Sequence, residues 1–189
     1  EGETPAASGP NVMDIDFDAL IANETDSTLK DMHEYFRDRT PTEKNQYTGM
    51  FQGKNLLLFT GEAFWIGAVN EQYTPTLYKL AHSGFVFENF YNPLWYYSTV
   101  DGEYAATTGL IPTNQVNASQ RYAGKNGVSM YFSMGNQLRA LGYPTLAYHN
   151  NTANYYDRNL SHPNLGYDFY ACDTGLDAVS YTHLRAHET

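Results

Sequence analysis

The feature that most constrains the fold is a short apolar run at residues 54–62, Lys-Asn-Leu-Leu-Leu-Phe-Thr-Gly-Glu. A continuous apolar run of this length, ending in glycine and an acid, is typical of a parallel strand that is buried on both faces. The carboxyl ends of parallel strands open into the crevice where ligands bind, so Glu62 is expected at a site. The run therefore predicts a sheet covered by helices.

Strand and helix patterns continue to alternate after this run. The expected elements are a helix from Pro75 to Gly84, a strand at 85–90, a loop at 117–127, a helix at 129–141 and a strand at 145–149. Before the run, residues 1–10 resemble a linker, residues 14–23 an arm and the residues after Ser27 a capped helix. This order predicts an α/β fold with a mainly parallel central sheet flanked by helices.

Residues 95–103, Trp-Tyr-Tyr-Ser-Thr-Val-Asp-Gly-Glu, place a hydroxyl beside two carboxylates. Thr99 is the hydroxyl, Asp101 and Glu103 are the acids, and residues 104–108 favour a helix that begins there. The amino end of a helix presents unpaired N–H groups and a partial positive charge, which hold phosphate. The stretch predicts a phosphoryl-transfer site at Thr99, with simple helix capping as the open alternative.

The charge balance limits the classes of partner. The 189 residues contain 11 basic and 21 acidic side chains, a formal charge of −10, so no basic surface is available for nucleic acid. An anionic substrate is still compatible with this charge, because a bound metal ion reverses the local sign. A single cysteine, Cys172, excludes an internal disulfide framework and a four-cysteine zinc site.

Four motifs in order resemble the lipoteichoic acid synthase family of the sulfatase and alkaline-phosphatase-like superfamily. They are residues 55–62, Tyr73-Thr-Pro-Thr-Leu77, residues 85–91 and Ser98-Thr99-x-Asp101-x-Glu103. The resemblance covers residues 51–177 and implies the N-terminal half of an alkaline-phosphatase-like sandwich, truncated here. Residues 1–50 are then a linker and an N-terminal helical arm.

The resemblance implies a set of site residues. The family's strand-end glutamate is a metal ligand, which corresponds to Glu62, and its threonine is both nucleophile and metal ligand, which corresponds to Thr99. The family binds glycerol phosphate with a histidine, an aromatic residue seven positions later and an arginine nine positions later. His149, Tyr156 and Arg158 have this spacing. The family aromatic is usually tryptophan, so Tyr156 is a departure. The Cys-x-Pro-x-Arg signature of formylglycine sulfatases is absent.

The implied activity is a metal-dependent transfer of glycerol phosphate from phosphatidylglycerol to a growing polyglycerol-phosphate chain or glycolipid acceptor. One divalent cation, manganese or magnesium, is expected to activate the Thr99 hydroxyl, which forms a covalent phosphothreonine. The implied location is the extracellular face of the cell membrane of a Gram-positive bacterium, with attachment through membrane helices ahead of Glu1.

One feature predicts that this 189-residue chain is itself inactive. The family completes its metal site with an Asp-His pair, and that dipeptide does not occur in the sequence. Residues 178–189 resemble a translated library-preparation adapter, so His183 and His187 are given no metal-binding role.

Two other functions remain open. One is a phosphoethanolamine transferase or phosphodiesterase of the same superfamily, which keeps Glu62 and Thr99 but grips a different substrate. The other is a non-catalytic cell-surface module that binds a polymer, since the 17 tyrosines can stack on sugars.

Overall fold

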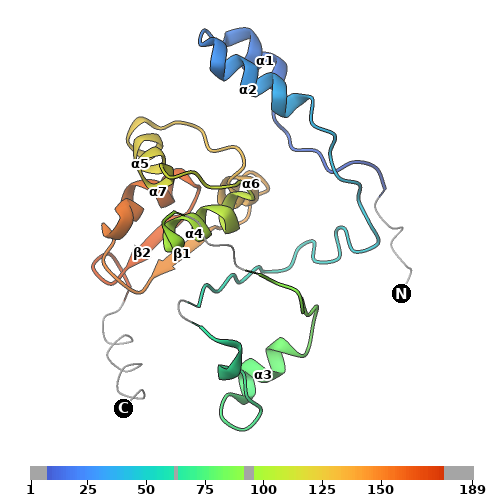
Figure 1. Ribbon diagram of the computed structural model, residues 1–189, viewed down its shortest axis with the longest axis vertical. Helices are drawn as coiled ribbons and strands as arrows, with labels where there is room; N and C mark the ends of the chain where they lie inside the picture. Colours follow the sequence, from blue (N-terminus) through green and yellow to red (C-terminus); the bar gives the residue numbers. More distant parts are fainter. Residues whose placement is uncertain (1–7, 62–63, 92–95, 177–189) are drawn as a thin grey trace. The chain divides into compact units, whose positions relative to one another are not determined.

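The computed structural model describes residues 8–61, 64–91 and 96–176 (Figure 1). The chain divides into two compact units at residues 86 and 87, and each is described by itself. The helices of the described residues are α1 (Phe17–Asn23), α2 (Ser27–Arg37), α3 (Pro75–Ala81), α4 (Ser98–Thr108), α5 (Val116–Asn126), α6 (Met134–Ala140) and α7 (Arg158–Asn164). The strands are β1 (Leu146–His149) and β2 (Asp168–Ala171).

Helix α2 of the first unit begins where the sequence predicts, although its cap is one residue earlier. The side chain of Asp26, not Ser27, accepts hydrogen bonds from the backbone N–H groups of Thr28 and Leu29. A carboxylate at this position satisfies two otherwise unpaired donors and complements the helix dipole. Helix α3 begins at Pro75 as expected, because proline lacks the N–H that the first helical position does not need.

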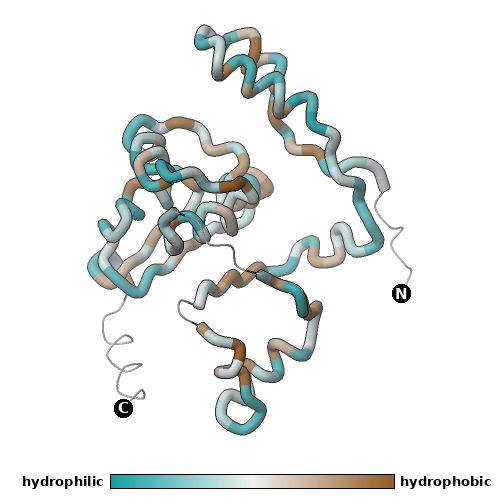
Figure 2. Tube along the Cα trace, viewed as in Figure 1, coloured by the Kyte–Doolittle hydropathy of each residue, from teal (hydrophilic) through white to brown (hydrophobic). Residues whose placement is uncertain are grey.

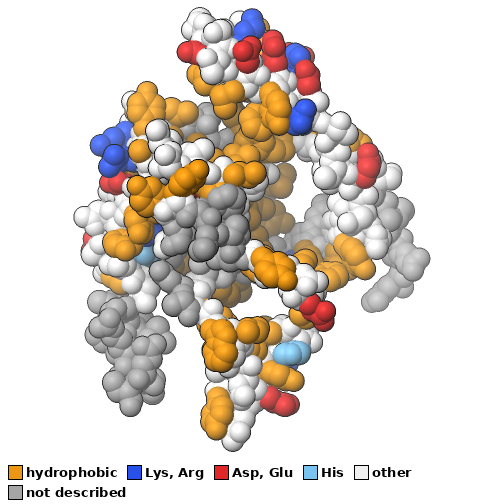
Figure 3. Space-filling model, viewed as in Figure 1, with side chains coloured by type: hydrophobic (Ala, Val, Ile, Leu, Met, Phe, Trp, Pro, Cys, Tyr) orange, Lys and Arg blue, Asp and Glu red, His pale blue; other side chains and the backbone are white. Residues whose placement is uncertain are grey.

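The predicted strands at 54–62 and 85–90 are wrong for the residues that the structure describes. Residues 54–61 and 85–90 have no strand structure and are exposed, with Leu57 at 76% and Phe59 at 84%. Hydrophobic residues are spread along the chain (Figure 2), and hydrophobic side chains are visible on the surface (Figure 3). An apolar run becomes a buried strand only when neighbours pair with its backbone and cover both faces. Within the described residues no strand pairs with either run, so the apolar pattern alone does not produce a sheet.

The second unit contains a parallel pair of strands. Strands β1 and β2 pair in the register Leu146 with Asp168 and His149 with Ala171, and α7 lies between them in the sequence. This strand, helix, strand order is a crossover unit, which confirms the α/β class. The strand at 145–149 was expected, whereas β2 was not.

Helix α5 corrects the loop predicted at 117–127. Asparagine, serine and glycine in this segment favour a loop, yet Val116 and Ala123 are buried and α5 packs against α7 (Figure 1). Burial of this face outweighs the weak local preferences. Helix α6 starts at Met134, later than the predicted 129, because Ser133 caps it by accepting from the backbone N–H of Asn136.

A small core joins these elements of the second unit. Its buried apolar members are Val100, Val116, Ala123, Ala153, Leu165 and Ala171. The buried hydroxyls of Ser133 and Thr145 donate to the backbone carbonyls of Leu165 and Gly166, so these polar groups are satisfied inside the core. None of the described helices is long and apolar enough to cross a membrane.

Replacement of Gly124 with alanine is expected to destabilise the second unit. A Cβ atom at this position overlaps the backbone carbonyl of Leu160, so α5 and α7 must separate. Overpacking of this kind costs about 1–3 kcal/mol. Urea denaturation of the 189-residue chain measures the loss, with Gly102→Ala as the control because nothing lies within 4 Å of its added methyl group. Equal stability of the two variants would contradict the packing described here.

Candidate functional site

The first turn of α4 holds Thr99, the predicted nucleophile. Tyr97 precedes the helix and exchanges two hydrogen bonds with Asp101: its N–H donates to Asp101 Oδ2 at 2.8 Å, and its carbonyl accepts from the Asp101 N–H at 3.0 Å. These bonds fix the turn that contains Thr99, which is half-buried. The helix begins at Ser98, so Thr99 lies within its amino end, not ahead of it.

The side chain of Asp101 bonds back to the residue ahead of α4, where no side-chain cap is present. Its side chain is 0% exposed, and its second oxygen, Oδ1, has no hydrogen-bond partner among the described residues. The other oxygen, through its bond to the N–H of Tyr97, connects the first turn of α4 to the residue ahead of the helix. This contact of Asp101 leaves a chemical role for Thr99 open.

Glu103 connects α4 to α7 through two basic side chains. Its Oε2 accepts from Arg158 Nη2 at 2.6 Å and from Arg158 Nε at 3.0 Å. Its Oε1 lies 2.9 Å from His162 Nε2. Arg158 is only 6% exposed, so this is a largely buried group of charges in which each oxygen of Glu103 has a donor.

The charge of Glu103 follows from these contacts. Burial by itself raises the pKa of Glu103, but hydrogen bonds from His162 and Arg158, with their charges, lower it to about 2. Glu103 is therefore ionised at neutral pH and matches the positive charge of Arg158.

The structure brings together His149, Tyr156 and Arg158, the three residues that the family resemblance assigns to the glycerol-phosphate site. Arg158 Nη1 lies 3.2 Å from His149 Nε2, and the guanidinium carbon lies 5.4 Å from the centre of the Tyr156 ring. Arginine only donates, so His149 Nε2 is the acceptor and the ring proton is on Nδ1. Whether the group binds glycerol phosphate stays a prediction.

The protonation of His149 is consistent with this arrangement. Burial and the charge of Arg158 lower the pKa of His149, and the backbone of Thr152 partly opposes this shift. The imidazole is therefore neutral at pH 7. Nδ1 is buried and lacks a hydrogen bond of standard geometry among the described residues.

A strained turn delivers Arg158 to this group. Tyr156 and Asp157 both have φ of 55°, a left-handed conformation that is costly for residues other than glycine. The Asp157 carboxylate lies 3.3 Å from Arg121 Nη1 on α5, which holds the turn in place. Such strain is typical of functional sites. Here the two strained residues directly precede Arg158, the first residue of α7.

The metal part of the predicted site is not assembled by the described residues. Glu62 lies outside them, so its distance to Thr99 is not part of the structure. Within the described ranges there is no group of three or more histidine, cysteine, aspartate or glutamate side chains arranged to hold a metal ion. These residues do not fit a catalytic cation by themselves, and the manganese or magnesium site stays a prediction.

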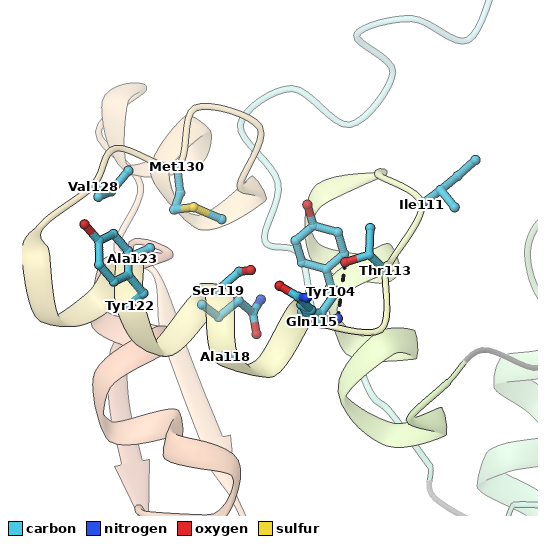
Figure 4. Close-up of a pocket in the computed structure, with 12 residues that line it drawn as sticks. Tyr104, Ile111, Thr113, Gln115, Ala118, Ser119, Tyr122, Ala123, Val128 and Met130 are labelled. Carbon is cyan, nitrogen blue, oxygen red and sulfur yellow. Dashed lines mark hydrogen bonds between the residues drawn. The ribbon is translucent and has the colours of Figure 1, made fainter. Parts of the chain in front are cut away.

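A pocket of about 520 Å³ lies elsewhere on the second unit (Figure 4). Tyr104 at the middle of α4 and Ser119 and Tyr122 of α5 line it, together with Val128 and Met130. Its lining is mostly apolar, and it includes none of Thr99, His149, Tyr156 and Arg158. The pocket is therefore separate from the predicted site.

His162 is the site residue that reasoning from the sequence missed. It lies four residues after Arg158, so the two side chains share one face of α7 and both reach Glu103. The spacing was visible in the sequence, but no helix was expected at 158–164. Glu103 was noted as a carboxylate near Thr99, without its two partners.

The chain is similar to known proteins over most of its length. The family model described as Sulfatase matches residues 54–187, well over half of the chain. The match extends into residues 178–189, whose assignment as an artefact stays a prediction. No solved structure matches the chain.

One curated relative supports a more specific resemblance. Lipoteichoic acid synthase 2 of Bacillus subtilis (strain 168) is 25% identical over 168 residues, which are 83% of this chain and 25% of the relative. The chain thus spans a quarter of that protein's length. The mixed α/β arrangement with its parallel strand pair is consistent with a truncated alkaline-phosphatase-like fold. Together, the family match, the relative and the fold class bear out the resemblance, and this chain belongs to the sulfatase family.

Proposed function

We propose that this chain contributes the nucleophile to a metal-dependent phosphotransferase that moves glycerol phosphate from phosphatidylglycerol to a growing lipoteichoic acid chain. The observation that carries the proposal is the position of Thr99, one helical turn before Glu103 on α4. Glu103 in turn holds Arg158 beside His149 and Tyr156. The name of the relative, lipoteichoic acid synthase 2, supports the choice of substrate.

In the proposed reaction the Thr99 hydroxyl oxygen attacks the phosphorus of phosphatidylglycerol. The bond from phosphorus to the diacylglycerol oxygen breaks, diacylglycerol leaves with a proton, and glycerol phosphate stays on Thr99. The terminal hydroxyl of the acceptor chain then displaces Thr99, which regains its proton.

A threonine hydroxyl is scarcely ionised at neutral pH, so the proposed activity includes a divalent cation. Manganese or magnesium would lower the pKa of the hydroxyl, with Glu62 and Thr99 as proposed ligands. Two donors do not hold such an ion tightly. Further ligands are therefore part of the proposal, and the 189-residue chain alone is expected to be inactive.

Arg158 and His149 are proposed to orient the phosphate. Arginine suits this role because its guanidinium stays charged and carries several N–H donors in fixed directions, so it can bond to a phosphate oxygen while other donors hold it in place. Since both substrates are membrane-associated, the proposal places the protein at the extracellular face of a Gram-positive cell membrane, with phosphatidylglycerol and a polyglycerol-phosphate or glycolipid acceptor as partners.

The test is to trap the covalent intermediate. A form of the protein that carries a complete metal site is mixed with phosphatidylglycerol in the absence of acceptor, quenched in acid and digested. Mass spectrometry is expected to find glycerol phosphate on the peptide that contains Thr99, and adding acceptor is expected to remove it.

Modification of another residue, or none, while diacylglycerol is released would contradict the proposal. Transfer of the group to water with acceptor present would instead identify a phosphodiesterase.

A further inference from the structure

We propose that Glu103 is a positioning residue that determines which edge of the Arg158 guanidinium faces a bound phosphate group. The inference rests on the proposed function, because it concerns the glycerol-phosphate site. It adds a role for a carboxylate that the proposed reaction does not use directly.

The first observation is how Arg158 divides its donors. Nε and Nη2 both face Glu103, at 3.0 and 2.6 Å from Oε2. Nη1 faces the other way, 3.3 Å from the Tyr155 carbonyl and 3.2 Å from His149 Nε2. The edge that most readily forms two parallel bonds to an anion is thus already bonded to Glu103.

The second observation concerns which contact a ligand can replace. The bonds to Glu103 are charge-assisted and short, whereas the contact with His149 is longer and joins the guanidinium to a neutral ring. An incoming phosphate oxygen therefore displaces His149 from Nη1 and leaves Glu103 in place. The rings of Tyr155 and Tyr156, whose centres lie 5.8 and 5.4 Å from the guanidinium carbon, further limit its rotation.

The third observation is that Glu103 also fixes the elements that carry the site. One carboxylate contacts Arg158 and His162 on α7 while it belongs to α4, the helix of Thr99. The orientation of Arg158 is therefore set relative to the helix of the nucleophile. Loss of the Glu103 side chain removes the ion pair between α4 and α7 that holds the Arg158 guanidinium, so the guanidinium can rotate.

Charge alone predicts the opposite effect of Glu103, which makes the inference testable. A carboxylate beside a phosphate site repels the phosphate, so its removal would strengthen binding if repulsion dominated. If Glu103 acts by orienting Arg158, its removal weakens phosphate binding. The guanidinium is then mobile in the free protein, and the loss of its conformational entropy on binding reduces the affinity. The sign of the change in affinity separates the two effects.

The experiment compares the 189-residue chain with its Glu103→Gln variant, using sn-glycerol 3-phosphate as the probe. Calorimetric titration gives the dissociation constant, and proton–nitrogen NMR follows the Arg158 Nε–H signal, assigned with Arg158→Lys. Glu103→Gln is expected to raise the dissociation constant about tenfold. It is also expected to speed the exchange of the Nε–H proton with solvent, so that the Nε–H signal is lost, because the bond to Glu103 that protects this proton is removed.

Asp168→Asn is the matched control. It removes a carboxylate that pairs with Arg139 at 2.9 Å on the same unit, at an exposed position. It is expected to change neither the affinity nor the Arg158 signal. If Glu103→Gln fails to fold, Glu103→Asp replaces it, since the shorter side chain keeps the charge but cannot reach both basic partners. It is expected to weaken binding as well.

The outcomes separate this inference from the proposed function. Unchanged or tighter binding by the folded variant, or an unchanged Arg158 signal, overturns the positioning role. If the unsubstituted chain does not bind the probe while the Arg158 signal is still lost without Glu103, the positioning role stands and the glycerol-phosphate assignment fails.

Discussion

Replacing Thr99 with alanine is expected to lower glycerophosphotransferase turnover by on the order of a thousandfold or more, because loss of a nucleophile removes the covalent route altogether. The change is expected in kcat, with little effect on the KM for phosphatidylglycerol, since the proposed phosphate contacts come from α7 and β1. Release of diacylglycerol from phosphatidylglycerol by a form of the protein with a complete metal site measures this effect.

Thr107→Ala is the control for this experiment. Thr107 lies later on the same helix and donates its hydroxyl to the backbone carbonyl of Glu103 at 2.8 Å, so its loss tests a threonine of α4 that has no proposed chemistry. Activity of Thr99→Ala within a few fold of the unsubstituted protein, under conditions where Thr107→Ala is also active, would exclude Thr99 as the nucleophile.

Acid is expected to destabilise the second unit through Glu103. The pKa of this carboxyl lies at about 2 in the folded protein, below its usual 4.5, so the folded state holds the ionised form more strongly than the unfolded state does. The stabilisation is complete above pH 4.5 and is lost as the pH falls towards 2. The difference corresponds to about 2–3 kcal/mol, reduced for the partial exposure of the side chain.

The measurement is urea denaturation of the 189-residue chain at a series of pH values from 7 to 2. The Glu103→Gln variant lacks the titrating group, so it is expected to be less stable at neutral pH and to lose less stability in acid. Because breaking a buried ion pair leaves Arg158 uncompensated, the loss at neutral pH is expected to be about 3 kcal/mol. Parallel stability curves for the two proteins would contradict the assigned role of Glu103 in the fold.

Several local features could be read from the sequence. Pro75 at the start of α3, the helix after residue 26 and the strand that ends at His149 all depend on short-range patterns, and the structure contains each of them. The three side chains that the resemblance assigns to phosphate binding, those of His149, Tyr156 and Arg158, also lie close together, while their binding role stays a prediction. Local geometry and the family resemblance were sufficient for these predictions.

Other features depended on contacts between distant segments. The apolar run at 54–61 is hydrophobic enough for a buried strand, but a strand also needs a neighbour for its backbone, and the described residues supply none. The reverse holds for α5, whose polar composition predicts a loop and whose burial against α7 produces a helix. Amino-acid composition indicates which secondary structure a segment favours locally, whereas packing against other segments determines which secondary structure it adopts.

The sequence by itself determined the family, the α/β class and the order of the candidate site residues, because motifs and hydrophobic patterns are properties of the chain. Only the tertiary structure decided that Glu103 on α4 pairs with Arg158 and His162 on α7. Arg158 lies fifty-five residues after Glu103 in the sequence. No local pattern encodes such a pairing. It arises because the packing of the second unit buries these side chains together, and buried charges are stable only when they are paired.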